Sequence, residues 1–313
     1  MVPIAHSLGK QAKGQRRIME TKEKGDAKED LLRTKIDEKI PNDDSTTMAS
    51  KKLRENASVK HRTICERCHR PLRVCICESL PDTPIALEKT ELVILQHPHE
   101  LKLKNRSVPI LNHCLESANL HLCVGRRLGD EIDPKIIKLL QTPNIPILLF
   151  PGSDNHTNIT NQNSNKLPPV LSLSQAKERM KEMLRGDVGM GEKSHSRKIV
   201  VLALDATWKY AREMHLANQK HNQYPSSMLQ VCLQAEDFPE DFRPRRFEIR
   251  TTPGENQNWM STTECVAWVL SQLESKPEIF SIIIKPLDEM VKIWNSFVKK
   301  SPTKEPPQKR QKR

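Results

Sequence analysis

The stretch Val200-Val-Leu-Ala-Leu-Asp205-Ala-Thr-Trp208-Lys-Tyr-Ala-Arg212 joins a continuous apolar run to an acid and then to helix-forming residues. An unbroken apolar run of this length is typical of a strand buried on both faces of a parallel sheet. An aspartate directly after such a strand lies at the carboxyl edge of the sheet, where α/β proteins bind ligands. Asp205 is therefore a candidate catalytic residue, although an aspartate here can equally cap the following helix.

Further apolar runs of the same kind alternate with amphipathic stretches along the chain. This alternation indicates an α/β domain built on a largely parallel sheet. The predicted strands are Leu92–Leu95, Leu120–Val124, Ile145–Phe150 and Ile199–Leu204. The predicted helices are Ser107–Ser117, Leu173–Arg185, Thr207–His215 and Thr262–Glu274.

The regions that flank this domain have compositions that do not support a core. Residues 1–62 carry 15 basic and 10 acidic side chains, and residues 299–313 carry 7 basic and 1 acidic. We predict disordered tails there, because such segments bury too little apolar surface to offset chain entropy. The polar stretch 153–169 is predicted to be a mobile insertion. The catalytic domain is expected at residues 83–298, after a small module at 63–82.

The net charge of +12 is concentrated in the two tails, which contribute +5 and +6. Long-range attraction for a nucleic acid therefore comes mainly from the tails. The C-terminal KRQKR resembles a nuclear import signal. The sequence has no apolar run long enough for a membrane helix and no secretory signal at its start. We expect a soluble protein of the nucleus and/or the cytoplasm, with no membrane association and no obligate protein partner.

Four cysteines form a compact cluster: Cys65, Cys68, Cys75 and Cys77 fall within 13 residues. Zinc takes four thiolates in a tetrahedron, and a C-x2-C turn supplies two of them. Such a closed site is structural, so we predict a zinc ion that stabilises a small N-terminal module. The alternative is a set of unpaired thiols.

Two further segments are candidates for a ligand pocket. The strand at 145–150 runs into Pro151-Gly152, a turn that leaves backbone groups available to a ligand. Ser261 and Glu264 have the spacing of a capping box at a helix N-terminus, which also offers N–H groups to a carboxylate. The candidate pocket residues are Phe150, Pro151, Gly152, Thr207, Trp208, Ser261, Thr262 and Glu264.

In this order, the motifs resemble the DTW-domain proteins of the tRNA-uridine aminocarboxypropyltransferase type. The matching pieces run through most of residues 65–290: C-x2-C…RP…C-x-C, Gln96-His-Pro-x-Glu100, Arg106-Ser-Val-Pro109, Gly125-Arg-Arg127, Phe150-Pro-Gly152, Asp205-Ala-Thr-Trp208 and Ser261-Thr-x-Glu-Cys265. Ala206 departs from the glycine of many relatives, and the insertion at 153–169 lies beside the expected pocket.

The resemblance implies a fold like the SPOUT methyltransferases, with a knotted parallel sheet that holds S-adenosylmethionine. It also implies transfer of the aminocarboxypropyl group to N3 of a uridine in the tRNA D-loop. The products would be 3-(3-amino-3-carboxypropyl)uridine and methylthioadenosine. Asp205 is the expected general base for the N3 proton, and the pocket residues named above are expected to bind the cofactor.

The expected RNA contacts are Arg106, Arg126, Arg127, Arg212 and Arg250, each of which could equally be a solvated surface residue. No Phe, Tyr or Trp precedes Phe150, so we expect recognition by tRNA shape and charge. Three alternatives remain: a SAM-dependent RNA methyltransferase, an aminocarboxypropyltransferase of ribosomal RNA, and a non-catalytic zinc-containing RNA-binding adaptor.

Overall fold

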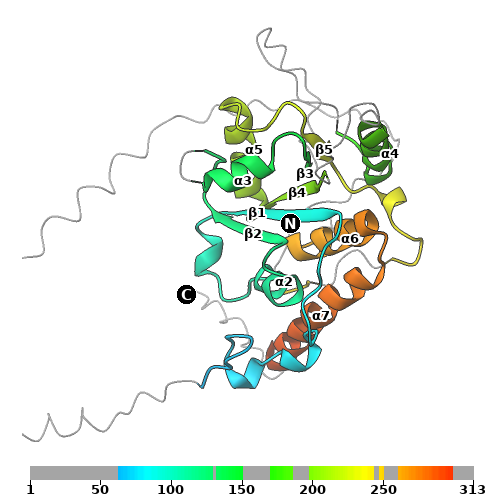
Figure 1. Cartoon of the computed structure of the whole chain (residues 1–313). Coiled ribbons are helices and arrows are strands. Elements are labelled where there is room, and N and C mark those ends of the chain that lie inside the picture. The colour runs from blue at the N-terminus through cyan, green and yellow to red at the C-terminus, as the bar shows by residue number, and fades with distance from the viewer. Residues whose placement is uncertain are drawn as a thin grey trace, which may run out of the picture. The chain divides into compact units, whose positions relative to one another are not determined.

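A computed structural model describes residues 63–129, 132–150, 170–185, 197–242, 247–249 and 260–298. In this part of the chain, five strands form one sheet in the order β2-β1-β4-β3-β5 (Figure 1). All pairings are parallel, which confirms the predicted α/β class. The strands are β1 Thr90–Gln96, β2 Leu120–Val124, β3 Ile145–Leu149, β4 Ile199–Asp205 and β5 Leu229–Val231.

Strand β4 lies at the centre of the sheet and pairs with β1 on one side and β3 on the other. All seven of its residues are buried. Four strands were predicted within two residues at each end, because each is built on a largely apolar run. Strand β5 was not predicted, since its three residues include a glutamine and give no strand pattern.

Helices cover both faces of the sheet (Figure 1). One face packs against α2 (Pro109–Cys114), α4 (Leu173–Arg185), α6 (Thr262–Glu274) and α7 (Glu278–Val298). The other packs against α3 (Pro134–Leu139) and α5 (Trp208–Lys220). Short 3-10 turns are η1 Leu72–Val74, η2 Cys77–Ser79, η3 Glu100–Lys102 and η4 Ala235–Asp237. Within the described residues, no helix is sufficiently long and apolar to span a bilayer.

The predicted helices differ in how well their ends were placed. Helices α4 and α6 have the predicted bounds. The predicted helix at 107–117 is shorter in the structure, where α2 begins at Pro109 and ends at Cys114. Helix α5 runs five residues past the predicted end at His215. Helices α3 and α7 were not predicted. The two predicted tails and the insertion at 153–169 lie outside the described residues.

A buried carboxylate links the end of α6 to the start of β1. Glu274, at the end of α6, is 2% exposed and accepts hydrogen bonds from the backbone N–H of Lys89 (3.0 Å) and Thr90 (2.8 Å) and from the Thr90 hydroxyl (2.6 Å). Lys89 directly precedes β1, and Thr90 is its first residue. The Glu274 carboxylate thus supplies hydrogen-bond acceptors for the donors at the start of this strand. A buried charge is tolerated here because several donors satisfy it.

Replacing Glu274 with alanine should therefore destabilise the whole domain. The substitution leaves buried donors unpaired, which costs about 3 kcal/mol or more. For a domain of this size, that loss lowers the melting temperature by roughly 6–12 °C, measurable by calorimetry. Glu274→Gln keeps one acceptor oxygen and should lose less. Exposed Glu116→Ala is the control, and a Glu274→Ala protein as stable as this control would contradict the assigned role.

Candidate active site and metal centre

The order of the strands places a topological switch point at the carboxyl ends of β1 and β4. After β1 the chain leads to β2 on one side, and after β4 it leads to β5 on the other. In open α/β sheets, a crevice forms at the carboxyl ends of two strands whose connections diverge in this way. Gln96 and Asp205 are paired residues at those two ends.

Asp205 is hydrogen-bonded to Gln96 at this switch point. The Gln96 side-chain amide donates to Asp205 Oδ2 at 2.7 Å, and the His97 N–H donates to the Asp205 carbonyl at 2.9 Å. Asp205 is 6% exposed. Helix α5 has Thr207 as its N-cap and no side-chain cap hydrogen bond, so Asp205 is not the cap of that helix. The alternative structural role considered for Asp205 is thereby removed. Sequence reasoning had not identified Gln96 as its partner.

An aromatic group lies on the α5 side of the sheet. Phe150 stacks on Trp208 (centroids 5.7 Å apart) and on His215 (4.2 Å). Burial lowers the pKa of His215 to about 4, so its ring is neutral at physiological pH. Gln219 and Tyr224 contact the two His215 nitrogens at 2.8 and 3.3 Å. Two of the predicted pocket residues, Phe150 and Trp208, are thus brought together.

The N-terminus of α6 carries the predicted capping box. Ser261 Oγ accepts from the Glu264 N–H at 3.3 Å, and Glu264 Oε2 accepts from the Ser261 N–H at 2.6 Å. Glu264 also accepts from the Phe247 N–H at 3.2 Å. These side chains therefore order the start of the helix. The adjacent Thr263 is fully buried, and its hydroxyl has no hydrogen-bond partner, which distinguishes it among the buried side chains of the described residues.

The predicted pocket residues are divided between the two sides of the sheet. Side chains alternate along a strand, so Asp205 shares the side of Val201 and Ala203, which pack with α6. Phe150 and Trp208 belong to the opposite side, with α5. Thr207 is exposed and Thr262 is buried. The two groups therefore approach each other only at the carboxyl edge. Pro151, Gly152 and Arg250 lie outside the described residues.

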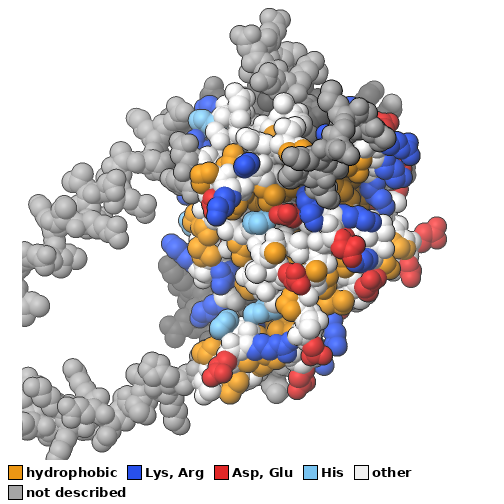
Figure 2. All heavy atoms as spheres, viewed as in Figure 1, with side chains coloured by type: hydrophobic (Ala, Val, Ile, Leu, Met, Phe, Trp, Pro, Cys, Tyr) orange, Lys and Arg blue, Asp and Glu red, His pale blue; other side chains and the backbone are white. Residues whose placement is uncertain are grey.

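Four of the arginines predicted to bind RNA fall within the described residues. Arg126 and Arg127 follow β2 and are exposed, as is Arg212 on α5, whereas Arg106 is half-buried. Buried Asn218 of α5 fixes the loop after β2: it accepts from the Leu128 N–H at 2.7 Å and donates to the Arg126 carbonyl at 3.3 Å. Figure 2 shows basic and acidic side chains interspersed on one face of the molecule, in keeping with the low net charge outside the tails.

The four predicted zinc ligands come together. All four Sγ atoms lie within 4.8 Å of one another. The separations are 3.4 Å for Cys65–Cys77 and 3.7 Å for Cys68–Cys75. Four sulfurs at 2.3 Å from a tetrahedral zinc are about 3.8 Å apart, so the cluster fits zinc closely. Backbone N–H groups of Cys68 and Arg67 help to lower the pKa of Cys65 to about 6, while burial raises the pKa of Cys77 to about 12.

The cysteine module packs on the same core as the sheet. Cys68, Ile76 and Leu80 belong to the cluster that contains α6 and α7. Arg70 donates to the Val74 carbonyl at 3.0 Å and contacts Met290 Sδ of α7 at 2.7 Å. Figure 1 shows the module, coloured blue, beside α7. Arg70 therefore attaches the module to the domain.

The remaining cysteines, Cys114, Cys123, Cys232 and Cys265, are buried and form no disulfide. Burial raises the pKa of Cys114 to about 12 and contributes most to raising that of Cys123 to about 11. Protonated thiols of this kind act as small apolar side chains.

Comparison with known proteins identifies the family of the chain. The model of the DTW domain matches residues 62–295, about three quarters of the chain. The chain belongs to the DTW-domain family. This match includes the cysteine module, Asp205 and the α6 cap. No solved structure matches the chain.

Several relatives of this DTW protein carry the name tRNA-uridine aminocarboxypropyltransferase. Type 2 from Macaca fascicularis is 26% identical over 231 residues, which cover 74% of this chain and 63% of the relative. Type 2 from Drosophila melanogaster is 29% identical over 74% of each chain. Type A from Arabidopsis thaliana is 28% identical over 76% of this chain and 83% of the relative. The chain thus spans just under two thirds of the Macaca relative's length.

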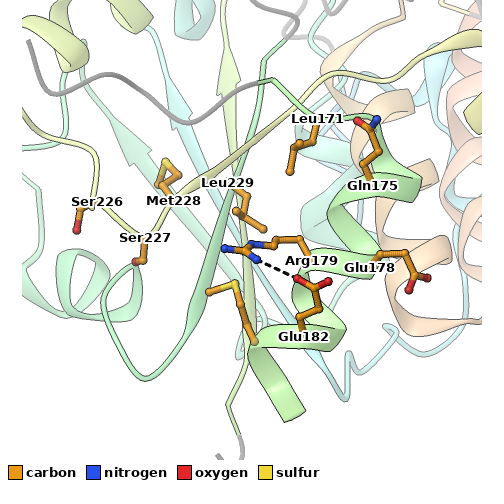
Figure 3. Close-up of a pocket in the computed structure, with 10 residues that line it drawn as sticks. Leu171, Gln175, Glu178, Arg179, Glu182, Ser226, Ser227, Met228 and Leu229 are labelled. Atoms are coloured by element: carbon orange, nitrogen blue, oxygen red, sulfur yellow. Dashed lines mark hydrogen bonds and ion pairs between the residues drawn. The ribbon is translucent and has the colours of Figure 1, made fainter. Parts of the chain in front are cut away.

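A separate cavity of about 690 Å³ lies between α4 and the segment before β5. Figure 3 shows Met228 and Leu229 on one side and Arg179, which pairs with Glu182 at 2.9 Å, on the other. It contains none of the predicted site residues and adjoins the amino end of β5, whereas ligands of parallel sheets bind at carboxyl ends. The DTW motifs and the strand order therefore locate the candidate site better than this cavity does.

Removing one cysteine ligand should abolish metal binding. We expect Cys77→Ser to lower the zinc content from one ion per chain to none, measured by inductively coupled plasma mass spectrometry of the purified protein. The module then loses its cross-link, and the melting temperature should fall by several degrees. Glu66→Gln, an exposed neighbour, is the matched control. Full zinc content in Cys77→Ser would exclude the four-thiolate site.

Proposed function

We propose that this protein transfers the 3-amino-3-carboxypropyl group of S-adenosylmethionine to N3 of a uridine in the D-loop of tRNA. The products are the modified uridine and methylthioadenosine. The observation that carries the proposal is the carboxylate of Asp205, held by Gln96 at the switch point of the sheet in a DTW domain. The names of the relatives support the same reaction.

The chemistry requires a base, because uridine N3 carries a proton and is a poor nucleophile while it does. Gln96 binds Oδ2 of Asp205 and fixes the orientation of the carboxylate. The second oxygen, Oδ1, accepts the N3 proton as N3 forms its new bond to carbon. General-base catalysis of this kind contributes about 10²–10⁴-fold, and correct orientation of the two reactants supplies much of the rest.

The residues present fit S-adenosylmethionine. When bound, it supplies a carbon attached to a positively charged sulfur, which leaves as a neutral thioether. The start of α6, with the unpartnered Thr263 hydroxyl, offers hydrogen bonds to the amino acid end of the donor. Phe150 and Trp208, with Pro151 and Gly152 outside the described residues, would line the remainder of the pocket. Ser261, Thr262 and Glu264 would shape the loop around it.

We further propose that the sheet is knotted as in the SPOUT methyltransferases. The order β2-β1-β4-β3-β5 supports this, because β4 follows β3 in the chain yet lies between β3 and β1. A strand inserted between two earlier ones is a requirement of such a knot. An experimental structure that traces residues 151–169 and 250–259 tests it directly.

The substrate uridine must be unpaired for N3 to be reached. Exposed Arg126, Arg127 and Arg212 are proposed to contact the RNA backbone, with Arg106 and Arg250. The domain limits 63–82 and 83–298, the disordered tails and a nuclear and/or cytoplasmic location remain predictions.

Separate carbon labels in the donor distinguish this reaction from its rivals. The protein is incubated with bulk tRNA and S-adenosylmethionine labelled in either the carboxyl or the methyl carbon. We expect the carboxyl label in tRNA and the methyl label in methylthioadenosine. Methyl label in RNA would show a methyltransferase, and absence of both labels from RNA, with RNA still bound, would indicate an adaptor. Purified ribosomal RNA is the control substrate.

Asp205→Asn tests the base without disturbing its surroundings. The new amide oxygen still accepts from Gln96, but it does not accept the N3 proton. We expect the rate of product formation to fall about 10²–10⁴-fold, while donor affinity and melting temperature stay close to wild type. Exposed Asp241→Asn is the matched control. Normal turnover by Asp205→Asn would rule out the aspartate as the base.

A further inference from the structure

Three rings from two distant parts of the sequence meet beside the carboxyl ends of β1 and β4. His97 stacks on Tyr210, with centroids 4.5 Å apart and planes 7° apart. His99 meets His97 at 4.8 Å and Tyr210 at 5.0 Å, edge-on to both. His97 is buried, Tyr210 is half-buried and His99 is exposed. We refer to these three residues as the ring cluster.

The ring cluster adjoins the candidate base. The N–H of His97 donates to the carbonyl of Asp205, and Tyr210 lies in the first turn of α5, which begins at Trp208. A nucleotide beside the one that reaches Asp205 therefore has the cluster within its range. Phe150 and Trp208, by contrast, form a separate stack further along the same side of the sheet.

Positive charge surrounds the cluster. Lys209 Nζ lies 5.9 Å from the centroid of the Tyr210 ring, and Arg212 is exposed on the next turn of α5. Burial, with the nearby His99 and Arg126, lowers the pKa of His97, while Glu213 acts in the opposite direction. The buried His97 is therefore an uncharged ring at neutral pH that supports Tyr210 from behind.

We propose that an unpaired RNA base next to the target uridine stacks on the exposed ring of His99 and meets the Tyr210 ring edge-on, with its phosphates against Arg126, Lys209 and Arg212. Single-stranded RNA is commonly recognised by bases stacked on aromatic side chains beside a basic groove. The identity of this RNA as tRNA rests on the proposed function. Recognition of the tRNA would then include base stacking in addition to the shape and charge expected from the sequence.

The test measures the affinity of full-length variants for a fluorescein-labelled tRNA transcript by anisotropy. Tyr210→Ala and His99→Ala should each weaken binding about 5- to 100-fold, as expected for one lost base stack. Tyr210→Phe should restore wild-type affinity, because it keeps the ring. The KM for S-adenosylmethionine should stay unchanged in all three. Leu216→Ala, exposed on the same helix, is the control.

Salt dependence separates stacking from charge. The slope of log affinity against log salt should be unchanged in Tyr210→Ala and should decrease by about one in Arg126→Gln, which removes one phosphate contact. Should Tyr210→Ala fail to fold, exposed His99→Ala decides the question. Wild-type affinity in His99→Ala, or in a folded Tyr210→Ala, overturns the proposal. Because binding needs no turnover, a wild-type protein that transfers no label refutes the proposed function and leaves this test intact.

Discussion

The pairing of β4 with both β1 and β3 is the constraint on which the site depends. Every residue of β4 is buried, so the strand is fixed on its two faces as well as its two edges. Its last residue, Asp205, is therefore placed opposite Gln96 with little freedom to move. After β1 the chain leads to β2 at one edge of the sheet, and after β4 it leads to β5 at the other edge. A ligand-binding crevice is therefore expected at the carboxyl ends of this pair. The apolar run that forms the strand thus determines where the carboxylate lies.

At the carboxyl ends of β1 and β4, the two faces of the sheet carry different kinds of residue, and this limits where reactants can meet. The α6 side holds Asp205 and a helix start with an unpartnered threonine hydroxyl, whereas the α5 side holds stacked rings and exposed cations. A polar amino acid end is better matched to the former, and flat bases to the latter. Reactants that contact both faces must meet at the carboxyl edge of the sheet, because the sheet itself separates the α5 face from the α6 face.

Much of this fold could be predicted because burial on both faces leaves a clear sequence pattern. The Cys65–Cys77 cluster and Asp205 could be identified because their signals are local in the sequence. The cysteines have a short spacing, and the aspartate directly follows a strand. Helix α7 was missed although Ile279, Ile283, Leu287 and Met290 recur at helical spacing, since Pro286 lies in its interior. The Gln96–Asp205 bond and the contact of Tyr210 with His97 and His99 were beyond sequence reasoning, because these partners are more than 100 residues apart and meet only through β1–β4 pairing.

The distribution of charge suggests how attraction and positioning are divided. The tails hold +11 of the net +12, so the central region has almost no net field to orient a polyanion. Attraction through the tails is long-ranged and screened by salt, and it does not select one nucleotide. Selection must then come from short-range contacts that the fold fixes rigidly. Asn218 holds the backbone of Arg126 against α5, and His97 stacks on Tyr210, so the loop that carries Arg126 and the Tyr210 ring both have defined positions. For the proposed RNA substrate, a preformed local surface beside a nearly neutral domain would favour discrimination among similar loops, because preorganised contacts lose less entropy on binding.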